Sequence, residues 1–160
     1  MVYLHKAVSM ADTIEGSVKE GLTARINKLT PTTEKHWGSM DVTQMLTHMN
    51  DAFRIALGMK PAIDKSNFFT HYVMFPAAVY VLPSWPKGEA TAPELDQQRE
   101  GSKPRDFYTE LEFLLKMIDV FNERENTKLK PHPMFGKLTK KQWADLLVKH
   151  LNHHLNQFGV

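Results

Sequence analysis

Two histidines near the C-terminal end of the sequence, His150 and His154, have the residue type and the spacing of a metal-binding pair. Residues four positions apart on a helix lie on neighbouring turns and point the same way. At about 100° per residue, His154 falls near the middle of an apolar helix face and His150 falls inside that face. Burying an unpaired polar group is costly, so two inward-facing imidazoles both need partners. A single metal ion could partner both of them.

His48, in the middle of a second predicted helix, is the third candidate ligand. It lies at the edge of the apolar face of that helix. A single core histidine is more often hydrogen-bonded than metal-bound, so His48 supports a metal site only together with the HxxxH pair. His153 falls at the rim of the apolar face. It could replace His150 or His154 as a ligand, but its position favours a place beside the ligands or in solvent.

Four long helices are predicted to position these histidines, because apolar residues recur at helical spacing in four stretches. These stretches cover about residues 10–29, 42–57, 106–122 and 139–160. Two pairs of residues predict capping boxes at the start of the second and the last helix. The pairs are Asp41 with Gln44 and Thr139 with Gln142.

The stretch between the second and third helices is the least regular part of the sequence. Residues 67–82 form its most hydrophobic window, which is too short to cross a bilayer comfortably and is interpreted as one or two short buried helical pieces. Residues 82–106 are rich in proline, glycine and charge and are expected to form a surface crossover. The predicted fold is all-α: a four-helix bundle with a long crossover that contains short helical pieces, in one domain over residues 1–160.

The composition narrows the possible functions. The chain has 160 residues, no cysteine and a formal net charge of +2. Without cysteine it can form no disulfide, no cysteine-based zinc finger and no iron–sulfur site, so His, Asp or Glu must hold any metal. The charge gives no polyanion signature, so neither nucleic acid nor a membrane is an expected partner. The first residues contain no apolar run long enough for a signal peptide, so a cytoplasmic location is expected.

Several other polar residues could also have a role in function. Glu110 could act as a carboxylate base, but a solvated position on the flank of its helix is expected. His132, which lies between two prolines, is interpreted as part of a structural turn, and the role of His71 stays open. A basic stretch precedes the last helix and is either a solvated loop or a rim that binds an anion. The rim would consist of Lys137, Lys140 and Lys141.

Three sequence segments carry a family resemblance: MLTHM around His48, HPMFGKLTKKQW and KHLNHHLNQFG. Together they resemble the DinB/YfiT-like superfamily of metal-dependent bacterial proteins, in a branch known mainly as a domain of unknown function. The crossover segment LPSWPKGEATAPELD is similar to that branch as well. The resemblance implies a four-helix bundle, often dimeric, whose order departs from plain up-and-down. It also implies a divalent metal bound by three histidines, which match His48, His150 and His154 here.

Two functions from different classes follow. The first is a metal-dependent enzyme of the thiol-dependent transferase or hydrolase type, acting on a small molecule. Some relatives in the superfamily use low-molecular-weight thiols, and a thiol cofactor would also account for a chain without cysteine. The second is a non-catalytic, dimeric metal-binding bundle with a structural or stress-related role. Imidazole ligands suit several metals, of which zinc or nickel is expected.

Overall fold

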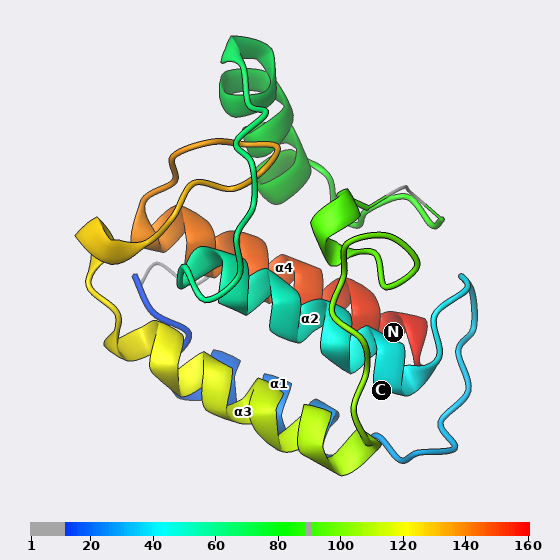
Figure 1. Ribbon diagram of the computed structural model, residues 1–160. Coiled ribbons are helices and arrows are strands. Elements are labelled where there is room, and N and C mark those ends of the chain that lie inside the picture. The colour runs from blue at the N-terminus through cyan, green and yellow to red at the C-terminus, as the bar shows by residue number, and fades with distance from the viewer. Residues whose placement is uncertain (1–11, 89–90) are drawn as a thin grey trace.

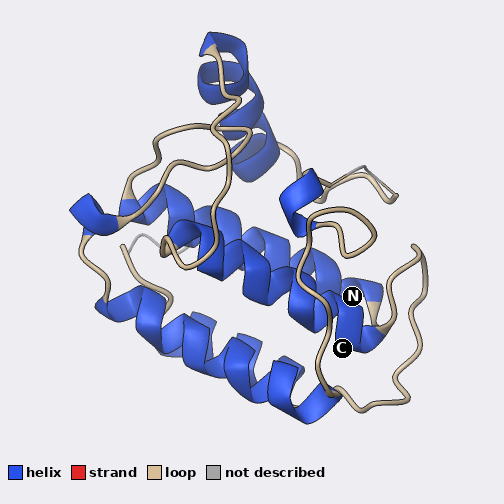
Figure 2. Ribbon diagram, in the orientation of Figure 1, coloured by secondary structure: helices blue, strands red, loops and turns tan. Residues whose placement is uncertain are grey.

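The computed structural model describes residues 12–88 and 91–160, and the described residues are helical without a β-strand (Figures 1 and 2). The long helices are α1 (Gly16–Ile26), α2 (Val42–Ala56), α3 (Phe107–Glu123) and α4 (Lys140–Gln157). The all-α prediction is confirmed. Among the described residues, no helix has both the length and the apolar character that crossing a membrane requires.

Local sequence signals set the ends of α2 and α4 as predicted. At each N-terminus, the cap side chain accepts a hydrogen bond from the backbone N–H of the glutamine three residues on, and the side-chain oxygen of that glutamine accepts one from the backbone N–H of the cap residue. These capping boxes satisfy donors that a helix end leaves without partners. Helix α1 begins later than predicted, with Glu15 as its cap. The predicted start at Met10 lies outside the described residues, while Ile14 packs in the core just before the helix.

Helix α2 lies at the centre of the packing (Figure 1). It contacts both α3 and α4, and α1 contacts α4. The buried face of α2 meets α3 through aromatic residues, among them Phe53 and Phe121, whose ring centroids are 6.1 Å apart at nearly a right angle. Trp143 of α4 is fully buried, and its indole N–H donates to the backbone oxygen of Lys130 at 3.0 Å. This core holds α2 and α4 side by side, with the candidate histidines between them.

The crossover contains the predicted short helices, but within residues 67–82 only Phe75 and Val79 are buried. Two wide π-helical turns, η1 (Thr70–Met74) and η2 (Ala77–Val81), project from the body of the protein (Figure 1). Pro76 lies between them, and its missing N–H and bulky ring disfavour a regular α-helix there. Phe68 and Val81 are 76% and 75% exposed. The expectation of buried helical pieces was wrong for most of the segment, because hydrophobicity alone does not say what a segment packs against.

The remainder of the crossover returns to α2. A short 3₁₀-helix, η3 (Pro93–Leu95), packs against α2 and presents a backbone carbonyl to His48. A second short 3₁₀-helix, η4 (Asn126–Lys128), follows α3. Asp51 of α2 is fully buried and accepts hydrogen bonds from the backbone and hydroxyl of Ser102, each at 2.7 Å. The second half of the crossover is thereby bound to α2.

Candidate metal centre

His48 is held on α2 with one ring nitrogen directed at the crossover and the other at α4. The side chain is buried, and its Nδ1 lies 2.9 Å from the backbone oxygen of Leu95. Because a carbonyl oxygen can only accept, Nδ1 carries the proton in this bond. Nε2 is then left with its lone pair, which is the arrangement that a metal-binding histidine requires.

His154 is oriented in the same way by a residue of its own helix. Its Nδ1 lies 2.8 Å from Oε1 of Gln157, which accepts the proton. The amide nitrogen of Gln157 donates to the backbone oxygen of Trp37 at 2.7 Å, which fixes the orientation of the amide. Gly38 makes this approach possible, since a Cβ there would stand 2.4 Å from the Gln157 amide nitrogen. His154 therefore presents a lone pair on Nε2 as well.

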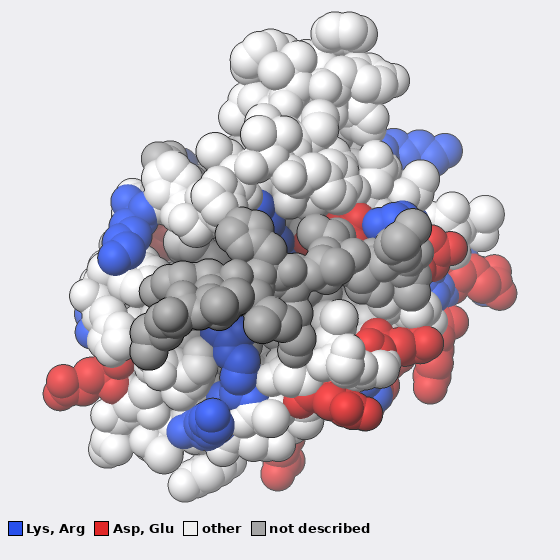
Figure 3. Space-filling model, turned by 180° about the vertical axis from the view of Figure 1, so that it is seen from behind, with Lys and Arg blue, Asp and Glu red and all other residues white. Residues whose placement is uncertain are grey.

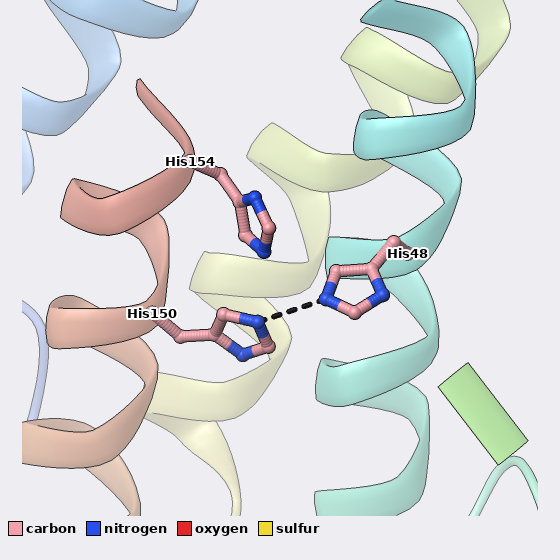
Figure 4. Close-up of side chains that lie close together, drawn as sticks. All are labelled: His48, His150 and His154. Carbon is pink, nitrogen blue, oxygen red and sulfur yellow. Dashed lines mark hydrogen bonds between the residues drawn. The ribbon is translucent and has the colours of Figure 1, made fainter. Parts of the chain in front are cut away.

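His48, His150 and His154 converge on one point between α2 and α4 (Figure 4). The three ring centroids are 4.8 Å from one another, and one nitrogen from each ring lies within 4.8 Å of the others. Nε2 of His48 and Nε2 of His150 are 2.8 Å apart. Three nitrogens bound to a tetrahedral ion at about 2.0–2.1 Å would lie roughly 3.3 Å apart. Side-chain shifts of the order of 1 Å bring all three nitrogens to that spacing, so the donor set fits a divalent metal.

Burial keeps these histidines neutral, which metal binding requires. Loss of solvation lowers the pKa of His48 and, together with the neighbouring imidazoles, lowers the pKa of His150 well below its ordinary value. The pKa of His154 falls to about 3, chiefly through burial. Neutral imidazoles are the form that donates a lone pair to a metal ion.

One side of the centre is more open than the others. His150 is half-buried, whereas His48 and His154 are buried. The ring of Trp85 lies 5.2 Å from that of His150 and 5.7 Å from that of His153, centroid to centroid. Trp37 contacts His153, at 6.1 Å. Trp85 therefore packs beside the least buried of the three converging histidines.

His153 occupies the rim position that was predicted for it. It is half-buried, and burial lowers its pKa. It is not one of the three residues whose ring nitrogens converge; instead it contacts the rings of Trp37, Trp85 and His154.

The lysines of the proposed anion rim are not brought to the histidines. Ten residues separate Lys140 from His150 along α4, which corresponds to about 15 Å of helix. Lys140 donates to the backbone oxygen of Asn122, and Lys141 donates to Asp145 at 2.7 Å. Lys137 is exposed at the surface. In the structure the side chains of Lys140 and Lys141 form contacts at the start of α4.

Glu110 differs from its expected solvated position. It is buried, and it accepts from Asn50 Nδ2 at 2.7 Å and from Arg105 Nε at 2.8 Å. The sequence pattern placed it on the flank of α3, and Asn50 and Arg105 convert that flank into an interior position.

Two other histidines, His132 and His71, hold the turn before α4 in place. His132 Nδ1 accepts from the backbone N–H groups of Met134 and Phe135, at 3.1 and 3.2 Å, so its interpretation as a structural turn residue is confirmed. His71 Nδ1 donates to the backbone oxygen of Phe135 at 2.6 Å and thereby ties the projecting segment to this turn.

Sequence reasoning missed the groups that orient the ligands. Gln157 had a usable signal, since it follows His154 by three residues on the same helix and such pairs face each other. The carbonyl of Leu95 had none, because any residue supplies a backbone oxygen. Trp85 was noted only as part of a segment similar to other proteins.

Gln157→Leu is expected to weaken metal binding by about 10- to 100-fold without removing a ligand. The change takes away the acceptor for the Nδ1 proton of His154, so the ring loses its fixed tautomer and orientation. Competition titration with a chromogenic chelator measures the affinity, and Gln98→Leu at an exposed loop position is the matched control. Equal affinity of the two variants would show that Gln157 does not orient His154.

The comparisons with known proteins place the chain in a family. The family model described as protein of unknown function (DUF1569) matches residues 17–159, which include all three histidines of the candidate centre. No curated protein and no solved structure matches the chain. Because the match covers almost the whole length, the chain belongs to the DUF1569 family.

Proposed function

We propose that this protein is a metal-dependent enzyme acting on a small molecule, with His48, His150 and His154 as the ligands of one divalent ion. The observation that carries the proposal is the convergence of three neutral imidazoles on one point, two of them with their Nδ1 protons held by other groups. Three protein ligands are typical of catalytic zinc sites, which keep a further position open. Zinc or nickel is the proposed metal.

The residues around the centre have separate roles in this proposal. The carbonyl of Leu95 and the amide of Gln157 hold the ligand rings and their tautomers. Burial of His48 and His154 excludes water from one side, while the half-buried His150 leaves the side near Trp85 for a substrate. When bound, the ion would lower the pKa of a water or thiol placed beside it.

We propose a low-molecular-weight thiol as the co-substrate, with a thiol-dependent transferase or hydrolase reaction. The support is the resemblance to the DinB/YfiT-like superfamily together with a chain that has no thiol of its own. The arrangement of α1, α2, α3 and α4, with a long crossover between α2 and α3, is compatible with the four-helix bundle of that superfamily.

Titration of the cobalt-loaded protein with bacillithiol, mycothiol, glutathione and cysteine tests this reaction type. At least one thiol is expected to produce a sulfur-to-metal charge-transfer band. The His154→Ala variant is the control and is expected to give none. If none of the four thiols gives a band in protein shown to contain cobalt, the thiol-dependent reaction is excluded, while metal binding itself remains measurable by elemental analysis.

We also propose a homodimer formed through the projecting segment, residues 67–82. The sequence from Ser66 to Leu82 contains no Lys, Arg, Asp or Glu, and the upper part of the surface in Figure 3 is correspondingly uncharged. Four of its aromatic side chains are 47–76% exposed, which corresponds to roughly 500 Å² of apolar surface. With the exposed aliphatic residues the total approaches the roughly 800 Å² that each partner buries in a standard interface.

Val81→Glu is expected to shift this dimer to monomer, because it places a charge at a position that is 75% exposed within the apolar surface. Tyr108→Glu is the matched control, since Tyr108 is 64% exposed on α3, away from the segment. Light scattering after size-exclusion chromatography measures the mass. A wild-type protein that is monomeric at all concentrations tested would contradict the dimer.

A further inference from the structure

A cavity lies on another face of α2, separate from the histidines. It has a volume of about 320 Å³ and is enclosed by α2, the start of α3 and the crossover segment 102–105. Thr47, which lines it, is next to His48 in the chain and therefore points about 100° away from it around the helix. The volume falls at the lower end of the range of small-molecule pockets, which is about 300–1,000 Å³.

Two buried carboxylates hold the walls of this cavity in place. Asp51 accepts from Arg54 at 3.2 Å and forms an ion pair with Lys60 at 3.1 Å, in addition to its bonds to Ser102. Burial by itself raises the pKa of Glu110, but the bonds from Arg105 and Asn50 outweigh it and lower the pKa overall. Both carboxylates are thus paired with protein groups, and they form a rigid frame rather than free ligand groups.

Asn50 supplies an acceptor that the protein leaves unused. The residue is 2% exposed and lines the cavity, and its Oδ1 has no hydrogen-bond partner among the described residues. Its Nδ2 donates to the backbone oxygen and to Oε2 of Glu110, at 3.0 and 2.7 Å. Both of these partners can only accept, so the orientation of the amide is determined. A buried oxygen without a partner costs about 1–3 kcal/mol, which a donor group that reaches Oδ1 would recover.

Cationic side chains with unused hydrogen-bond donors also line this cavity. Arg54 donates from Nη1, which leaves its Nε and Nη2 without an acceptor in residues 12–88 and 91–160. Arg105 donates from Nε, and its two terminal nitrogens are likewise without an acceptor in this described part. Lys103 lines the cavity as a third cation and donates to the backbone oxygen of Gln97. Guanidinium groups with unused N–H donors are the preferred partners of carboxylates.

We propose that this cavity binds a free α-amino acid. The ammonium group donates to Asn50 Oδ1, close to the carboxylate of Glu110, and the carboxylate of the ligand is bound by the cations Arg54, Lys103 and Arg105. A molecule that carries only one of the two groups satisfies only one side of the cavity. The site is independent of the metal centre, because none of its lining residues is one of the three histidines.

The test is a thermal-shift screen of the metal-loaded protein against the twenty standard amino acids, followed by calorimetry with the strongest hit. At least one amino acid is expected to raise Tm. Its deaminated analogue and its carboxamide are each expected to bind at least tenfold more weakly than the amino acid. If no amino acid raises Tm, or if the deaminated analogue binds as well as the amino acid, the proposal is wrong.

Two variants test whether the amino acid binds in this cavity. Arg54→Gln and Lys103→Gln are each expected to raise the Kd for the hit about 10-fold or more, the usual cost of losing a bond to a charged group. Arg99→Gln, which removes an exposed arginine that does not line the cavity, is the matched control. Lys103 is itself exposed, so its variant tests the site even if Arg54→Gln does not fold. An unchanged Kd in Lys103→Gln and in folded Arg54→Gln would place the amino acid elsewhere and overturn the assignment.

Discussion

His48→Ala, His150→Ala and His154→Ala are each expected to abolish tight binding of one divalent ion per chain. The expected loss of affinity exceeds about 100-fold, the upper end of what removing a group that merely orients a ligand costs. The physical reason is that each of the three imidazoles contributes one of the converging nitrogens, and two remaining ligands do not hold a zinc or nickel ion against a chelator. Elemental analysis after dialysis against a weak chelator measures the stoichiometry.

His153→Ala is the control for this series. His153 adjoins His154 in the chain and shares its residue type, but it lies outside the group of converging nitrogens. It is expected to retain one ion per chain. Loss of the ion from His153→Ala, with retention by His150→Ala, would show that the ligand assignment is wrong.

The largest expected effect on stability comes from Asp51, away from the metal centre. Asp51→Ala is expected to lower the free energy of unfolding by about 3 kcal/mol, because it leaves buried charge and buried N–H groups without their partner. Asp51 has no exposed surface; its two oxygens accept from Ser102 and Arg54, and one of them forms an ion pair with Lys60. Urea denaturation followed by circular dichroism measures the change.

Asp119→Ala removes the same type of side chain from an ion pair at the surface. Asp119 pairs with Lys19, and the two side chains are 55% and 38% exposed. Solvent screens such a pair, so the expected loss is below about 1 kcal/mol. If both variants lost the same small amount, the bonds of Asp51 would contribute no more than an exposed pair, and the crossover would not depend on them for its position.

Much of the local structure was predictable because it depends on neighbours in the sequence. Both capping boxes involve residues three positions apart, and the spacing of His150 and His154 is one turn of a single helix. The same periodicity placed His153 at the rim of the buried face. The residues of each of these features are close together in the sequence, so helix geometry alone determines which side chains are neighbours.

Exposure was predicted less well, because it depends on elements far away in the chain. The apolar character of residues 67–82 predicted burial, yet no described element covers Phe68 or Val81. Glu110 was placed on a solvated flank, and it is the crossover residue Arg105 and the α2 residue Asn50 that enclose it. Helical periodicity shows which residues share a face, but it does not show which faces meet.

The sequence by itself determined four long helices, the capping boxes of two of them and a pair of histidines on one face of the last helix. Only the tertiary structure decided that His48 meets this pair, since 102 positions separate it from His150 and the contact exists only because α2 packs against α4. The same packing brings the carbonyl of Leu95 to His48 and the loop at Trp37 to Gln157, and these contacts set the tautomers of two ligands. It also leaves Lys140 and Lys141 about 15 Å along α4 from the histidines. Spacing on a single helix specifies the direction of a side chain, whereas a site built from several elements requires the packing that brings them together.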